Sequence, residues 1–534
     1  MRTLIFGFAS VTSVLCIASA CSSSTDDCLT TSTCPPTAGS AGTSNAAGDS
    51  GASGTSTSGG NGGGGGNGSG SGSGGTSGAS GDSGGSAGES GMGGEGIPPC
   101  DSSQSPSTEA CLVSNDSAIF VDPAGKDTDP GTKAAPVKTI NKAVELAGNA
   151  KIVIACDGTY DEQLKLTGAT RLYGGFSCSS SATPWVYEPG KRAKVAPSAR
   201  GFALSIAAGA AAVLIEDFEF VAKDGLEAGE SSIAAFVNTS GSVALNRFKL
   251  VAGKGVNGAD GKLTPVAFPM QSELNGKAAS GDIGGAFNLY TCPAGGPTKG
   301  GVGGNGGSAA TGGGLGLPDL GMGKGGVQGS CSVNGTGQDG ANATPQPPAS
   351  GATKLGTITP AGWNGTPGAD GTPGTPGQGG GGGTGSGDGG GGGGGGAGGC
   401  GGAGGTGGKP GGSSIALLVL NSTLSINASE LLGADAGKGG KGAAAQEGQA
   451  TAGNGGVQVP KGCQGGNGGK GGAGGAGGGA AGGISVGIAY QGAAPIPDAA
   501  TLITLGVAGT KGIGGVAGTN DGIDGKAQSI LEIP

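Results

Sequence analysis

The chain of 534 residues contains no histidine, where average usage would give on the order of ten. This absence excludes Ser-His-Asp triads, histidine general bases, and zinc or copper sites that depend on imidazole. Aromatic residues make up only 3 % of the chain and charged residues 12 %, whereas 134 residues are glycine. An ordinary packed core therefore cannot extend over most of this sequence.

Basic residues are also scarce, with 28 Lys and Arg against 37 Asp and Glu and a formal net charge of −9. An acidic chain repels phosphate backbones, so we expect no nucleic-acid partner. The densest acidic group, Glu216, Asp217 and Glu219, is predicted to divide between the two faces of one strand and to form a solvated strand edge. No carboxylate pair can be assigned to glycosidase chemistry from spacing. The glycine tracts lack the strand-G-x-x-x-x-G-K-S/T context of a phosphate loop. We therefore expect no catalytic residue, no metal site and no cofactor.

Only the N-terminus carries a long apolar run, from Leu4 to Ile17, which follows Arg2 and precedes the small residues 18–20. This run is too short to span a bilayer, and with Cys21 directly after the small residues it resembles a bacterial lipoprotein signal. The resemblance implies export, removal of residues 1–20, lipidation of Cys21 and anchoring in a membrane, the outer membrane or cell surface being the expected place. Cleavage by ordinary signal peptidase is the alternative that the small residues leave open.

Residues 21–98 contain almost nothing to bury and consist mainly of Ser, Gly, Thr, Ala and Asp. This composition predicts a disordered tether, with an r.m.s. span of roughly 50 Å, between the lipid and the rest of the chain.

The twelve cysteines indicate disulfides in an exported chain. Cys16 leaves with the signal and Cys21 takes the lipid. By proximity in sequence we pair the remaining candidates as Cys28–Cys34, Cys100–Cys111, Cys156–Cys178, Cys292–Cys331 and Cys400–Cys463.

The ordered region opens at residue 119 with a strand, a Gly/Asp loop, a P-x-x-T-I phrase, and a short helical stretch from Asn141 to Ala147. A buried strand over residues 151–155 and a D-G-T-Y phrase follow. This order resembles the entry cap of right-handed parallel β-helix proteins of the pectate-lyase-like class, over about residues 119–176. The resemblance implies an all-β, irregular solenoid, and a carbohydrate-active enzyme as one alternative function.

An internal repeat supports a solenoid. Units begin at Ser231, Ser413 and Gly483, each with apolar blocks of four to six residues, and each ends in an Ala-Gly phrase that opens a glycine-rich tract. If the units stack in register, all three tracts leave from one corner and lie side by side. Residues 530–533 are predicted to close the stack. The resulting division is 1–20 signal peptide, 21–98 tether, 99–252 cap and first coils, 253–412 insertion, 413–436 coil, 437–483 insertion, and 484–534 final coils with a short glycine-rich loop.

The glycine tracts repeat every three residues, which is the period of a polyproline II turn. Three alternatives stay open for them: disordered loops, side-by-side polyproline-II-like chains joined by a disulfide, and a collagen triple helix, for which the triplets are too few. The regular small residues also motivate a flat, water-ordering surface similar to glycine-rich antifreeze bundles. The small residues in question are Ala403, Thr406, Ala473 and Ala476.

Two loops hold the remaining candidate sites. Trp185, Tyr187, Lys191 and Arg192 could form a glycan contact. Residues 518–524 resemble a single unit of a calcium-binding β-roll, a site type that requires tandem copies. We expect a cell-surface structural or adhesive lipoprotein that binds extracellular polymer, polysaccharide among them, or envelope material without catalysis. Its partner at the membrane is the bilayer itself, through the lipid on Cys21.

Overall fold

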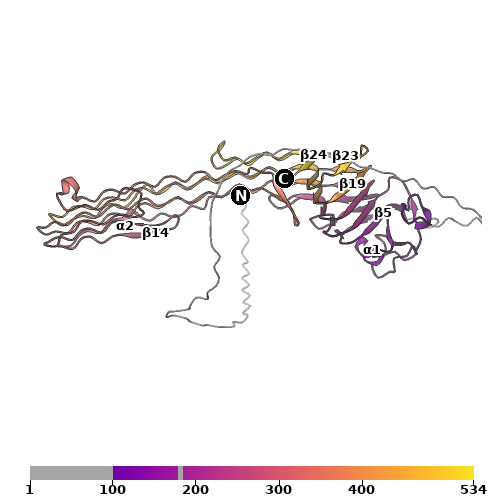
Figure 1. The fold of residues 1–534 in the computed structure, drawn as a ribbon, viewed down its shortest axis with the longest axis horizontal. Helices are drawn as coiled ribbons and strands as arrows, with labels where there is room; N and C mark the ends of the chain where they lie inside the picture. Colours follow the sequence, from indigo (N-terminus) through magenta and orange to yellow (C-terminus); the bar gives the residue numbers. More distant parts are fainter. Residues whose placement is uncertain (1–99, 179–184) are drawn as a thin grey trace, which may run out of the picture. The chain divides into compact units, whose positions relative to one another are not determined.

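A computed structural model describes residues 100–178 and 185–534, which fold as a β-solenoid with glycine-rich chains beside it (Figure 1). The predicted signal peptide, the lipidation site Cys21, the tether and the Cys28–Cys34 pair lie outside the described residues.

Three stacked sheets, named A, B and C here, form the solenoid. Sheet A contains β1 (Ala118–Val121), β2 (Ile152–Cys156), β5 (Thr170–Ser177), β9 (Ala212–Glu216), β12 (Ser242–Asn246), β19 (Thr423–Asn427) and β22 (Ile496–Pro497), with β6 (Val186–Tyr187) antiparallel on β5. Sheet B contains β3 (Thr159–Tyr160), β7 (Ala193–Val195), β10 (Phe218–Val221), β13 (Lys249–Val251), β20 (Glu430–Leu432) and β23 (Leu502–Thr504). Sheet C contains β4 (Leu164–Leu166), β8 (Leu204–Ile206), β11 (Ser232–Asn238), β18 (Ser414–Leu420), β21 (Ser485–Gln491) and β24 (Ala527–Glu532).

Each complete coil visits sheets C, A and B in turn, and successive coils pair in parallel register. The predicted right-handed parallel β-helix is therefore confirmed. Its interior is one apolar cluster in which Val237, Leu245, Leu250 and their neighbours are fully buried. Strands buried on both faces read as continuous apolar runs, which is why β18 has no alternation: all seven of its residues are buried.

The entry cap contains α1 (Ile140–Ala147), whose N-cap Thr139 accepts a hydrogen bond from the Lys142 amide. Ile140, Ala143 and Ala147 are buried against the first coil, on the face that the sequence predicted. Because a solenoid end would otherwise expose its apolar interior, this helix completes the core. A 3₁₀ helix (Ala110–Leu112) precedes β1.

Three buried serines at one register position fix where the glycine-rich insertions leave the solenoid. Ser232, Ser414 and Ser485 are paired across β11, β18 and β21. Their hydroxyls accept hydrogen bonds from amides at or just before the start of each insertion, at 2.8, 2.8 and 3.0 Å: Gly253, Ala434 and Gly506. The three insertions therefore leave from one corner, as the repeat predicted.

The insertions lie side by side from their first residues, because the Gly255 amide donates to Asp435 and the Ala436 amide donates to Val507. We call residues 253–412, 437–483 and 507–526 the glycine layer; its chains run alongside one another in Figure 1. Short elements interrupt it: α2 (Gln271–Leu274), a π-helical turn (Cys331–Gly335), the hairpin of β14 (Leu289–Cys292) and β15 (Gly296–Lys299), and the hairpin of β16 (Gly356–Thr359) and β17 (Gly362–Gly365).

The centre of the glycine layer is a set of three chains, residues 366–385, 391–412 and 463–483. The Gly380 amide donates to Gly396, the Gly396 amide to Gly466, and the Gly466 amide to Gly381, at 2.8, 3.0 and 2.8 Å. The same cycle recurs three residues away in each chain: the Gly377 amide donates to Gly399, the Gly399 amide to Gly469, and the Gly469 amide to Gln378. A bonded group every third residue, directed at different neighbours in turn, is the pattern of polyproline-II-like chains and not of a β-ladder.

This packing contradicts the disordered-loop alternative and differs from collagen, because the chains come from one polypeptide and the 366–385 chain runs antiparallel to its two neighbours. Glycine is required by close approach: a Cβ on Gly401 would collide with the carbonyl of Gly374. The water-ordering idea loses its basis in part, since Ala403 and Ala476 are buried, Ala473 is half-buried and only Thr406 is exposed.

Buried amide side chains replace backbone partners within the layer. Gln449 is 4 % exposed; its carbonyl accepts from the Cys400 amide at 3.1 Å, and its amide donates to Pro269 at 2.8 Å. Gln378 bridges Gly316 and Met322 in the same way. These bonds satisfy backbone groups that the tight packing removes from water.

Four disulfides join the described residues. The predicted pairs Cys100–Cys111 and Cys156–Cys178 are confirmed. The predicted pairs Cys292–Cys331 and Cys400–Cys463 are wrong: the bonds are Cys292–Cys400 and Cys331–Cys463. Nearness in sequence decides pairing only in short loops, whereas lateral packing of distant chains brings the β14–β15 hairpin to Cys400 and the π-helical turn to Cys463.

Candidate binding site

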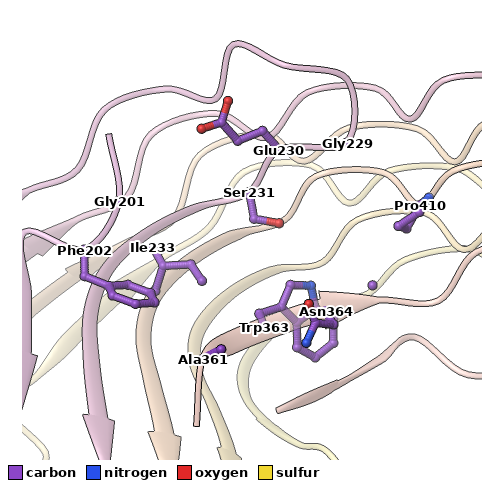
Figure 2. A pocket seen from close by; sticks show the side chains of 11 residues that line it. Gly201, Phe202, Gly229, Glu230, Ser231, Ile233, Ala361, Trp363, Asn364 and Pro410 are labelled. Atoms are coloured by element: carbon purple, nitrogen blue, oxygen red, sulfur yellow. The ribbon is translucent and has the colours of Figure 1, made fainter. Parts of the chain in front are cut away.

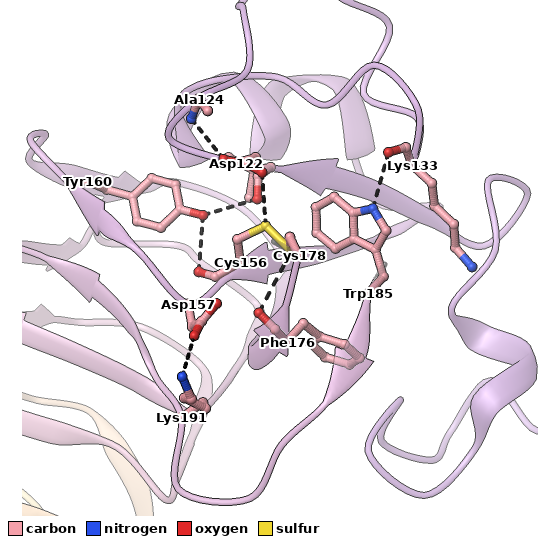
Figure 3. Close-up of a disulfide and its surroundings, with 11 residues drawn as sticks. Asp122, Ala124, Lys133, Cys156, Asp157, Tyr160, Phe176, Cys178, Trp185 and Lys191 are labelled. Carbon is pink, nitrogen blue, oxygen red and sulfur yellow. Dashed lines mark hydrogen bonds and ion pairs between the residues drawn. A yellow bond between two sulfur atoms is a disulfide. The ribbon is translucent and has the colours of Figure 1, made fainter. Parts of the chain in front are cut away.

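The four residues predicted to contact a glycan do not form one patch. Trp185 is buried, packs edge-on to Phe120 with the ring centroids 4.7 Å apart, and donates its indole N–H to the Lys133 carbonyl at 3.1 Å (Figure 3). Its ring therefore belongs to the outer core of sheet A, beside the Cys156–Cys178 disulfide, and only its edge reaches a surface cavity that Tyr187 also lines.

The three other residues of that prediction are engaged elsewhere. Tyr187 is half-buried and donates to Asp217 at 3.3 Å. Lys191 pairs with Asp157 at 2.8 Å, as Figure 3 shows, and Arg192 pairs with Glu430 at 3.0 Å. Sequence proximity suggested a common surface, but Trp185 and Tyr187 line one cavity and Lys191 and Arg192 line another.

The predicted solvated strand edge at Glu216 and Asp217 is wrong. Asp217 has a φ of 57°, so the chain turns there from β9 to β10 and the alternation of faces is interrupted. Both carboxylates are buried, and Arg247 from the next coil donates to each of them at 2.8 Å. Ser105 also donates to Oε2 of Glu216, the oxygen that Arg247 contacts, and Asn246 donates to Oε1.

This ion cluster is closed on itself. Hydrogen bonding to Asp217 raises the pKa of Arg247 above its usual value, so the guanidinium stays charged in the native protein. All four carboxylate oxygens accept hydrogen bonds from the protein. The cluster therefore holds two coils together and offers no unengaged base at this point.

A cleft of about 400 Å³ opens where the β16–β17 hairpin of the glycine layer packs on sheet C. Figure 2 shows Phe202 and Ile233 on the solenoid side, Trp363 and Asn364 on the hairpin side, and Glu230 on the far rim. The volume lies within the range of about 300–1,000 Å³ typical of ligand pockets. The cleft is thus assembled from two parts of the chain more than 120 residues apart.

The walls of the cleft are fixed by close backbone approach. Gly362, the first residue of β17, has a φ of 117°, and a Cβ added there would lie 2.9 Å from the Phe202 ring. The ring of Trp363 covers Gly356 on the paired strand. Phe202 in turn packs on Phe236 with the ring centroids 5.2 Å apart. Both aromatic rings of the cleft are therefore held in place without a ligand.

Three residues that line the cleft carry polar groups. The indole nitrogen of Trp363 is buried and has no hydrogen-bond partner among the described residues. Glu230 receives Arg200 and the amides of Leu226 and Glu227, all on its Oε2 atom. These backbone bonds lower the pKa of Glu230, which keeps the carboxylate ionised. The Ser231 hydroxyl oxygen accepts from the Ser413 amide at 2.8 Å and retains a proton to donate.

Sequence reasoning missed this cleft because Trp363 stands in a Gly/Thr/Pro stretch with no apolar periodicity. The only available signal was local: residues 356–365 alternate around a Pro-Ala-Gly turn, which is a hairpin pattern. Nothing in that pattern says which face of the solenoid the hairpin covers.

Two groups of residues in the described part of the chain have the spacing of metal ligands: Cys100, Glu109 and Cys111; and Asp122, Cys156 and Cys178. In both groups the two cysteines are joined to each other, so no thiolate is available. In the loop that resembles a β-roll unit, Asp521 accepts from the amides of Gly514 and Gly518 and pairs with Lys511. That carboxylate is therefore engaged by the protein.

Comparison with known families matches residues 123–215 to a family described as a protein of unknown function (DUF1565). The matched segment contains the helix of the entry cap and the first coils, and it includes Phe202 of the cleft but not the hairpin. No curated protein and no solved structure matches the chain. Among the described residues, no helix is both long and apolar enough to cross a membrane. The four disulfides suggest an extracellular or periplasmic protein.

Proposed function

We propose that the chain is an exported lipoprotein of the outer membrane or cell surface, anchored through Cys21, that binds extracellular polymer or envelope material without catalysis. The observation that carries the proposal is the glycine layer. It is cross-linked by disulfides that span 108 and 132 residues and is extensively hydrogen-bonded between its own chains. Such a layer costs much conformational entropy to order, and a spacer would not need it.

Anchoring is tested by replacing the lipidated residue. Cys21→Ser should move the protein from the membrane fraction to the soluble extracytoplasmic fraction and abolish labelling with radioactive palmitate. Ser22→Ala is the matched control and should remain labelled and membrane-bound. Retention of C21S in the membrane fraction, or absence of label on the wild type, would contradict lipid anchoring.

Polymer contact is tested with the soluble C21S protein in oxidised form. It should co-sediment with insoluble extracellular material isolated from the producing cells, and reduction of its disulfides should weaken retention because the glycine layer loosens. Recovery of all the protein in the supernatant would contradict the proposed role.

The second candidate function is a carbohydrate-active enzyme, for which the observation is the meeting of Glu216, Asp217 and Arg247 on one side of the solenoid. The mutual ion pairing of these groups weakens this candidate, because it leaves no group ready to abstract or donate a proton. Release of reducing or unsaturated ends from polygalacturonate by the wild type, lost in E216Q, would restore it.

A further inference from the structure

The cleft between sheet C and the β16–β17 hairpin has the chemistry of a site for a neutral pyranose ring. We propose that it binds a neutral pyranose unit of a polysaccharide, stacked on Trp363 and held by hydrogen bonds to the cleft's polar groups. This inference rests on the proposed polymer-binding function and assigns it a site.

Two aromatic rings form the apolar part of the cleft. Phe202 and Trp363 come from opposite sides of the cleft, and both are only partly buried. A pyranose has apolar C–H faces and a rim of hydroxyls, so it can cover an aromatic surface while its edge stays polar. Ile233 and Pro410 extend the same apolar lining. A fixed aromatic surface also binds at a low entropic cost, since its rings are already ordered.

The polar groups of the cleft retain unused hydrogen-bonding capacity. The buried Trp363 N–H lacks a partner among the described residues, and a buried donor without an acceptor costs about 1–3 kcal/mol. Nearby, Ser231 can donate and Glu230 can accept through Oε1. Sugar hydroxyls both donate and accept hydrogen bonds, so they suit these groups. A purely apolar ligand would leave the indole N–H unpaired.

The charges at the cleft determine whether a neutral, an acidic or an amino sugar is favoured. Glu230 is ionised and its charge is balanced by Arg200 at 3.0 Å, so the cleft gains little from a ligand of either sign. A uronic acid would place its carboxylate near Glu230, and an amino sugar would compete with Arg200. The balanced pair therefore favours a neutral unit.

The test uses the oxidised C21S protein and affinity gel electrophoresis with three soluble probes: hydroxyethyl cellulose, polygalacturonate and chitosan oligomers. The wild-type cleft should bind the neutral polymer most strongly. Trp363→Ala should weaken that binding about tenfold or more, because a central aromatic contact is lost. Trp363→Phe keeps a ring but no N–H and should lose less, about three- to tenfold. Phe287→Ala, an exposed aromatic outside the cleft, is the matched control and should bind as the wild type.

A second measurement, which does not alter the cleft, distinguishes loss of binding from misfolding of the Trp363 variants. The chain has two tryptophans, Trp185 and Trp363, so Trp185→Phe leaves the indole of the cleft as the sole tryptophan. Its fluorescence should shift on addition of the neutral probe and not with the acidic or cationic probe.

Four results would overturn the inference. They are equal binding by W363A, W363F and F287A, tighter binding of an acidic or cationic probe, an unchanged fluorescence of the sole Trp363 at saturating neutral probe, and no binding of any probe. The proposed function is decided separately by co-sedimentation with the native extracellular material. Retention there with an inert cleft would leave the function and reject the site.

Discussion

At the scale of single residues, Arg247 shows how one side chain can hold two coils of a solenoid together. Its guanidinium is partly exposed, whereas the two carboxylates that it pairs with are 8 % and 5 % exposed. Buried charges are tolerated only when they are paired and hydrogen-bonded. Replacing Arg247 alone therefore affects both coils.

Arg247→Ala should lower the free energy of unfolding by about 3 kcal/mol, because two buried carboxylates lose their cation. Urea denaturation at pH 7 measures the change. The triple variant R247A/E216Q/D217N should recover most of it. Lys142→Ala is the control, since Lys142 forms an exposed pair with Glu145 and should cost about 0.5 kcal/mol or less. A loss as small as that of K142A would show that the cluster is not structural.

Buried tyrosines predict a loss of stability in alkali. Burial, with Glu216 nearby, raises the pKa of Tyr173 to about 12. A phenol whose pKa is raised on folding keeps its stabilising contribution below its unfolded pKa of about 10 and loses it as the pH rises toward 12. Thermal unfolding midpoints should therefore fall between pH 10 and 12. The fall should be smaller in Tyr173→Phe, which should match the wild type at pH 8; an identical decline in both proteins would contradict this assignment.

At the scale of elements, the glycine layer replaces a hydrophobic core by backbone packing. Its central chains contain runs of buried glycine at which neighbouring backbones touch. Apolar side chains contribute little there, so stability depends on backbone hydrogen bonds and close contact between chains. Substitution by a residue with a Cβ should therefore be tolerated least at these glycines.

Gly401→Ala should destabilise the layer by about 2–3 kcal/mol, because the new Cβ would collide with the Gly374 carbonyl and neighbouring backbone would have to move. Gly387→Ala is the matched control, since an added Cβ there meets nothing within 4 Å. Hydrogen exchange of the glycine amides at 370–380 and 396–408 should accelerate in G401A and remain as in the wild type in G387A. Equal exchange in the two variants would argue against close chain packing.

At the scale of the whole molecule, the two long-range disulfides determine how firmly the glycine layer is held. Cys331–Cys463 joins the first insertion to the second, and Cys292–Cys400 joins two parts of the first. Glycine-rich chains have high entropy when unfolded, so cross-links that constrain that state stabilise the layer strongly. Reduction should therefore loosen the layer before the solenoid, whose interior is apolar.

Limited trypsin digestion with mass spectrometry tests this order. In the oxidised protein, cleavage after Lys299 and Lys470 should be slow, because their backbone amides are bonded to neighbouring chains. C331S/C463S should lose about 2–4 kcal/mol locally and expose Lys470 first. C292S/C400S is the paired variant and should instead expose Lys299, which lies in the β14–β15 hairpin held by that disulfide. Rapid cleavage of the oxidised wild type at both lysines would contradict an ordered layer.

The amino-acid sequence by itself determined the period of each part of the chain. Apolar blocks at Ser231, Ser413 and Gly483 recur with matching exits, so stacking in register and the side-by-side insertions followed from the repeat alone. The two short disulfides also followed, because a loop of 11 or 22 residues permits few other partners.

Only the tertiary structure decided the lateral contacts between coils and between chains. The spacing of residues along the sequence does not encode these contacts. The pairing of Cys331 with Cys463, the burial of Glu216 and Asp217 against Arg247, and the seating of Trp363 on sheet C each join residues from different coils or chains. Periodicity determines how a chain repeats, whereas the identity of its neighbours depends on loop lengths and on where the insertions turn back. For that reason the solenoid could be predicted from the sequence and the cleft could not.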